Sequence, residues 1–92
     1  MPLASFPFRY TNLGVLELRR GALDSAQSNF RTAQSLAPHM YEPFFNGALL
    51  AHKSGQHEAA YRQVCSALKA YPEHAPSNEL KALLQKQFTS LS

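Results

Sequence analysis

The sequence repeats itself at an interval of 34 residues, and this periodicity limits the possible folds more than any other feature. Superposing the chain on itself at this offset needs no insertion, and small residues fall on small ones. Identical residues coincide at Asn12 and Asn46, Leu16 and Leu50, Gly21 and Gly55, Ala26 and Ala60, Ala33 and Ala67, and Pro38 and Pro72. A period of this length is typical of arrays in which one helical or mixed unit stacks against the next.

The first unit has the pattern of two helices joined by a tight turn. Apolar residues follow a helical stripe from Phe8 to Arg20, and a second helix is predicted from Leu23 to Leu36. Gly21 separates the two helices, because glycine adopts a left-handed backbone conformation without a steric penalty. Pro38 ends the unit, since proline cannot continue the hydrogen-bond ladder of a helix.

The second unit repeats this scheme and is followed by one unpaired helix. Helices are predicted from Glu42 to Lys53 and from His57 to Ala70, with a turn at Gly55 and an end at Pro72. A last helix is predicted from about Pro76 to Phe88, with polar residues over much of its surface. That polar character is typical of the capping helix at the end of a stacked array. The chain is therefore predicted to be all-α, with two helix–turn–helix units and a C-terminal capping helix.

Small side chains recur where the helices of a unit are expected to approach closely, at Gly14, Ala26, Ala48 and Ala60. A bulky residue at any of these positions is expected to force the hairpin apart, at a cost of about 1–3 kcal/mol.

The two units resemble the tetratricopeptide repeat, a 34-residue helix–turn–helix unit with conserved-type small, aromatic and proline positions. The matching residues are Tyr10, Leu13, Gly14, Ala26, Phe30 and Pro38 in the first unit, and Phe44, Gly47, Ala48, Ala60, Val64 and Pro72 in the second. The units depart from the family pattern at Glu17, Ala51 and Val64, where the family has aromatic residues. The resemblance implies an α-α superhelix with repeat one at about 7–40, repeat two at about 41–74 and a capping helix at about 76–88.

Several stretches are also similar to the C-terminal end of a tetratricopeptide-repeat subunit of the BBSome. They are residues 12–17, 35–43, 71–74 and 87–91. This resemblance implies a scaffold in a multi-protein complex that moves membrane proteins in and out of cilia, located in the cytoplasm at the cilium or ciliary base. It also implies a fragment of a longer solenoid, in which Phe6, Phe8, Tyr10 and Leu13 are left partly uncovered. We therefore expect the isolated chain to fold this segment back over itself or to self-associate.

In a stacked array of this kind, the first helix of each unit lines a concave face that binds extended or helical partners. Projected onto that geometry, Val15, Phe45 and Leu49 are predicted to contact an apolar partner surface, and Arg19 and Lys53 an acidic rim. Phe45 is the preferred anchor, because aromatic residues concentrate binding energy at interface centres. The alternative interpretation is that Val15 and Leu49 only pack inside their own hairpins.

Residues that often carry chemistry have structural explanations in this sequence. Cys65 is a single cysteine with no histidine–carboxylate arrangement near it, and the four glycines are dispersed rather than gathered in a phosphate-binding loop. His52 and His57 lie on opposite sides of the Gly55 turn, not at the spacing of a metal-binding pair on one helix face. We therefore predict no enzyme, no metal site and no cofactor.

The charge pattern bears on nucleic acids and membranes. Nine Lys and Arg against six Asp and Glu give a formal net charge of +3. These cations are spread one or two per helix without interleaved aromatic residues, so a solvated surface is favoured over a nucleic-acid-binding repeat module, which remains an alternative. A repeat adaptor unrelated to cilia is another. No apolar run approaches the roughly 20 residues of a bilayer-spanning helix, so no direct membrane insertion is expected.

Overall fold

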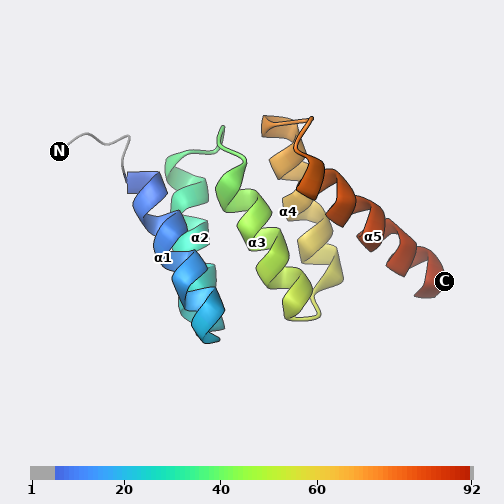
Figure 1. Ribbon diagram of the computed structural model, residues 1–92, viewed down its shortest axis with the longest axis horizontal. Coiled ribbons are helices and arrows are strands. Elements are labelled where there is room, and N and C mark those ends of the chain that lie inside the picture. Colours follow the sequence, from blue (N-terminus) through green and yellow to red (C-terminus); the bar gives the residue numbers. More distant parts are fainter. Residues whose placement is uncertain (1–5, 92) are drawn as a thin grey trace.

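A computed structural model describes residues 6–91 and contains five α-helices over that range (Figure 1). They are α1 (Phe6–Arg20), α2 (Leu23–Leu36), α3 (Glu42–Lys53), α4 (His57–Ala70) and α5 (Ala75–Leu91). The helices α1 and α2 form one antiparallel hairpin, α3 and α4 form a second, and α5 packs against α4. No strand occurs in this part of the chain. The prediction of an all-α helical repeat array is confirmed.

Helix bounds agree with the sequence pattern in the middle of the chain and differ at its two ends. The helices α2, α3 and α4 begin and end at the predicted residues. The helix α1 begins at Phe6 rather than Phe8, because Pro7 lies in the first turn, where its missing N–H is not needed. The helix α5 continues to Leu91 beyond the predicted Phe88, since no glycine or proline interrupts it. The division into repeats at 7–40 and 41–74 stays a prediction.

The two hairpin turns have the same backbone geometry. Gly21 has φ +82° and Gly55 has φ +77°, both in the left-handed region that favours glycine. In each turn the residue after the glycine donates its backbone N–H to a carbonyl in the last turn of the preceding helix, at 2.9 Å for Ala22 to Glu17 and 2.8 Å for Gln56 to Ala51. These bonds satisfy carbonyls that the helix end leaves without partners.

Inside the first hairpin, the two helices approach most closely at Gly14. A Cβ atom placed on Gly14 would lie 2.5 Å from Cε1 of Phe30, well inside van der Waals contact. Ala26 and Ala33 of α2 are fully buried. The hairpin is therefore closed by small residues packed around one phenylalanine ring.

Buried apolar side chains form two clusters, each lying between successive helices. The first cluster consists of Ala26, Phe30 and Leu50 and joins α2 to α3. The second cluster consists of Ala48, Ala51, Ala60, Val64, Leu80 and Leu84 and joins α3, α4 and α5. The molecule is accordingly elongated, with extents of 49 × 28 × 18 Å and the helices following one another along it (Figure 1).

Within the described residues, none of the helices combines the length and the apolar character needed to cross a membrane.

Candidate protein-binding site

The residues predicted to bind a partner lie in two rows on the first helices of the two hairpins. Val15 on α1 and Leu49 on α3 are half-buried, and they are 34 residues apart. Arg19 and Lys53 are exposed in the last turns of the same two helices. Positive charge at the carboxyl end of a helix is favoured by the helix dipole, so these cations are stabilised where they lie. An apolar position and a cation thus recur together in successive hairpins.

The apolar members of this set also pack inside the array. Val15 contacts the first cluster, whereas Phe45 and Leu49 contact the second. This packing agrees with the alternative interpretation of Val15 and Leu49. Since all three side chains are only half-buried, each also keeps surface toward solvent. Their role in binding stays a prediction.

Phe45, the preferred anchor, belongs to an aromatic cluster that links α3 to the turn before α5. Its ring meets the ring of His74 edge-on, with centroids 4.9 Å apart and an interplanar angle of 84°. The rings of Tyr41 and Tyr71 also contact His74, at 4.5 and 5.6 Å between centroids. Nδ1 of His74 shares a hydrogen bond of 2.7 Å with Oγ of the buried Ser77. Phe45 is therefore held in place by its own chain, which sequence position alone does not indicate.

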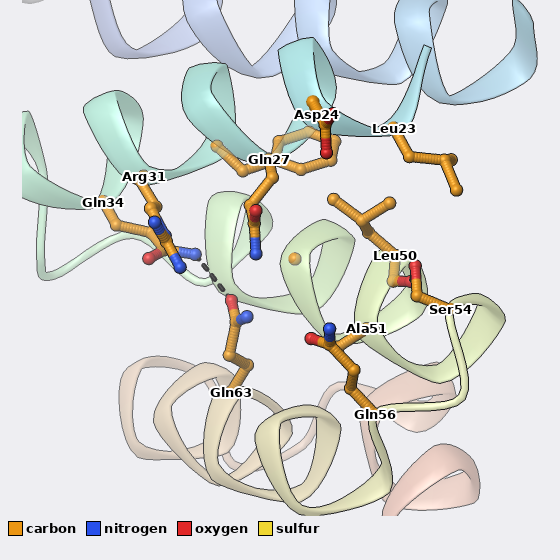
Figure 2. Close-up of a pocket in the computed structure, with 12 residues that line it drawn as sticks. Leu23, Asp24, Gln27, Arg31, Gln34, Leu50, Ala51, Ser54, Gln56 and Gln63 are labelled. Carbon is orange, nitrogen blue, oxygen red and sulfur yellow. Dashed lines mark hydrogen bonds between the residues drawn. The ribbon is translucent and has the colours of Figure 1, made fainter. Parts of the chain in front are cut away.

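A pocket of about 210 Å³ lies between α2, α3 and α4 (Figure 2). Its apolar floor is made by Phe30, Leu50 and Ala51. Its polar lining is made by Asp24, Gln27, Arg31, Gln34, Gln56 and Gln63. Figure 2 shows the amides of Gln27 and Gln56 directed toward the cavity from opposite sides. Since a carboxamide both donates and accepts hydrogen bonds, the pocket is suited to a small polar group that does the same.

Gly47 makes room for the hydrogen bonds at one side of this pocket. Nε2 of Gln34 donates to Oε1 of Gln63 at 2.7 Å and to the carbonyl oxygen of Pro43 at 3.1 Å. A Cβ atom on Gly47 would collide with the side chains of both glutamines. This amide bridge ties the second helix of one hairpin to the second helix of the next.

Sequence reasoning missed the pocket, although a signal for it exists. Gln27 and Gln34 are seven residues apart on α2, as are Gln56 and Gln63 around the start of α4. A spacing of seven places two residues on one helix face, so both pairs were candidates for a shared polar surface.

The corresponding space between α4 and α5 is filled. The residues 34 positions after Gln27 and Ser54 are Tyr61 and Phe88. Their rings pack edge to face with centroids 5.8 Å apart. The pocket is therefore a property of the first interface between hairpins, created by small and polar residues at positions that carry aromatic rings at the second.

His52 and His57 come closer together than their positions on either side of the Gly55 turn suggest. Their ring centroids are 5.8 Å apart, and Nδ1 of each ring is buried without a hydrogen-bond partner. Among residues 6–91 no group of three or more His, Cys, Asp and Glu side chains is placed to hold a metal ion. Cys65 is a half-buried free thiol on α4.

Comparison with known proteins relates these features to characterised sequences. No family model matches the chain. Over 82 residues, 89% of its length, the chain is 42% identical to tetratricopeptide repeat protein 8 of Mus musculus and 40% identical to the Homo sapiens protein of that name. The chain is related to the tetratricopeptide repeat proteins.

The resemblance to tetratricopeptide repeats seen in the sequence is thereby confirmed, and it agrees with two helical hairpins stacked side by side. The match covers 16% of the mouse protein and 15% of the human one, so the chain spans about a sixth of the length of these curated relatives. The relationship supports a role in protein–protein interaction of the kind that stacked helical repeats perform.

Proposed function

We propose that this chain is a non-catalytic protein–protein interaction scaffold that works in a BBSome-like multi-protein complex for ciliary membrane-protein trafficking. Its partners are other protein subunits, and its location is the cytoplasm at the cilium or ciliary base. Support comes from the 40–42% identity to tetratricopeptide repeat protein 8 and from the likeness of residues 35–43 and 71–74 to a BBSome subunit.

The recurrence of one apolar residue and one cation in successive hairpins carries the proposal. Val15 and Arg19 on α1 are followed 34 residues later by Leu49 and Lys53 on α3. A partner segment that alternates apolar and acidic side chains complements such a surface, with Phe45 offering the largest apolar contact. Because Arg19 and Lys53 are exposed, they can pair with carboxylates without unfolding any part of the array.

Reversing these two charges tests the proposed surface. We expect the double variant Arg19→Glu, Lys53→Glu to lose at least about tenfold in recovery of BBSome subunits with the tagged chain, because the acidic rim would be repelled. The matched control is Arg62→Glu, Lys69→Glu, which reverses two exposed charges on α4. Circular dichroism checks that both variants keep their helix content. Equal recovery with both double variants would contradict the proposed surface.

The same experiment separates the alternatives. Recovery of other proteins but no BBSome subunit would identify a repeat adaptor unrelated to cilia. For the nucleic-acid alternative, fluorescence anisotropy with single-stranded RNA and duplex DNA is measured as salt is raised. Tight binding that falls steeply with salt would favour a nucleic-acid-binding module, because counterion release gives that dependence. We expect no such binding.

A further inference from the structure

Leucine occupies the same position in the first helix of each unit, yet its exposure differs greatly along the array. Leu16, Leu50 and Leu84 are successive members of the 34-residue series on α1, α3 and α5. Leu84 is 0% exposed in the second cluster, and Leu50 is 5% exposed in the first cluster. Leu16 is 53% exposed. One side chain in one structural position is thus covered twice and open once.

The structure shows what covers this leucine where it is buried. Leu50 lies against Ala26 and Phe30 of α2, which are four residues apart on one face. Leu84 shares the second cluster with Ala60 and Val64 of α4, the residues 34 positions later. In both cases the cover includes the second helix of the preceding hairpin, with an alanine and then a larger apolar residue one turn along.

Leu16 is the centre of a wider exposed face on α1. Leu13, one turn earlier, is 42% exposed, and Arg9 and Arg20 are exposed at either end of the same helix face. We call these four residues the α1 outer face. Glu17, the only carboxylate of α1, accepts a hydrogen bond from Asn29 of α2 and so is engaged within the hairpin. The face is apolar in the middle and cationic at both ends.

We propose that the α1 outer face docks the second helix of another helix–turn–helix unit, one that carries an alanine and two larger apolar residues at successive spacings of four. This rests on the proposed function as an interaction scaffold and specifies the kind of partner. The pattern is that of Ala60, Val64 and Leu68 on α4. The docked helix has carboxylates opposite Arg9 and Arg20, because charges at the edge of an interface select a partner of opposite sign.

The third residue of the ridge follows from Leu13. The residue 34 positions after Leu13 is Gly47, which lies against Gln34 of α2. A leucine cannot occupy that space beside a glutamine without leaving the amide poorly solvated. An apolar residue such as Leu68, which occupies the position of Gln34 on α4, suits Leu13 better.

A second copy of this chain does not supply such a helix. The ridges on α2 and α4 are already covered, with Ala26 and Ala60 fully buried. The outward side of α5 is polar, with exposed Glu79 and Gln85. Pairing two α1 outer faces would bring arginines of both copies together, and like charges at a contact are repulsive. The occupant is therefore a hairpin that ends in an uncovered second helix.

An extended chain tests the proposal with a defined occupant. A copy of residues 41–74 is placed directly before residue 7, which keeps the 34-residue register and sets an α4 ridge against Leu16. We expect the melting temperature to rise by at least about 5 °C over the parent chain. Leu16→Asp in the original unit should remove this gain. Leu36→Asp changes a leucine of similar exposure, 50%, at the end of α2, and should leave the gain intact.

Two further measurements sharpen the result. Extension with a copy of residues 7–40 instead, which sets Gln34 against Leu13, should give a smaller rise. Sedimentation of the parent chain at several concentrations should show a monomer. A rise that survives Leu16→Asp, or no rise at all, would overturn the proposal. So would a dimer that Leu16→Asp abolishes, because the occupant would then be a second copy. Failure here with loss of partners in the Arg19→Glu, Lys53→Glu variant would leave the proposed function standing.

Discussion

The two ends of the array carry the same kind of helix but present different faces outward. At one end, α1 exposes Leu13 and Leu16. At the other end, the α5 residues that correspond to the buried Ala48 and Ala51 of α3 are Ala82 and Gln85, and both are exposed. A position in a repeat is therefore not apolar or polar by rule. Its chemistry follows what lies against it, and the polar side of α5 has the character of a terminal cap.

The largest effect is expected where the series of leucines is fully covered. Leu84→Ala removes a side chain with no exposure, so we expect the free energy of unfolding to fall by about 2–5 kcal/mol. Leu50→Ala should cost less, because the neighbouring pocket gives the remaining space access to water. Urea denaturation of both variants measures the difference. An equal loss at the two positions would show that the pocket does not soften the first interface.

A smaller effect is expected at the turns, which compare the hairpin at the open end with the inner one. Gly21→Ala should lower the free energy of unfolding by about 1–2 kcal/mol, because alanine is strained at φ +82°. No atom lies within 4 Å of an added Cβ at this position, so the cost is in the backbone alone. Gly55→Ala should cost the same, and thermal unfolding compares them. A neutral result at either turn would mean that the turn changes shape when substituted.

A third change probes the amide bridge beside the pocket. Gly47→Ala should lower the free energy of unfolding by about 0.5–1.5 kcal/mol, because its Cβ displaces the Gln34–Gln63 hydrogen bond. The matched background is Gln63→Ala, in which the bridge is already absent. There Gly47→Ala should cost little, and a double-mutant cycle from urea titrations measures the coupling. An additive double variant would argue against the bridge.

The smallest effect is expected at the open end itself. Leu16→Gln should change the free energy of unfolding by no more than about 0.5 kcal/mol, because the side chain is more than half exposed. The same substitution at Leu84 buries an amide and should be strongly destabilising. If chemical denaturation gives a large loss for Leu16→Gln, the comparison of the two ends is wrong.

The fold could be predicted largely from the sequence because its determinants are local. Gly21, Gly55, Pro38 and Pro72 mark helix ends through backbone geometry that each residue imposes on its own position. The extra turn of α5 was missed because no such marker follows Phe88. Local signals are therefore sufficient for helices and insufficient for their frayed ends.

The sites depend on pairs of residues from separate helices, and these are harder to predict. The pocket requires Gly47 on α3 to leave space for Gln34 and Gln63 from two other helices. The ring contact of Phe45 with His74 joins residues that no single-helix pattern connects. Periodicity identifies which face a residue occupies, whereas contact across an interface depends on the volume of both partners.

Dividing the apolar interior into two clusters between neighbouring helices has a consequence for how the molecule comes apart. Each helix draws its stabilisation from the next one along, so cohesion is shared by adjacent elements only. Heat or denaturant should release the outermost helices first, and amide protons in α3 should exchange more slowly than those in α1. Every further hairpin added in register would slow that exchange again.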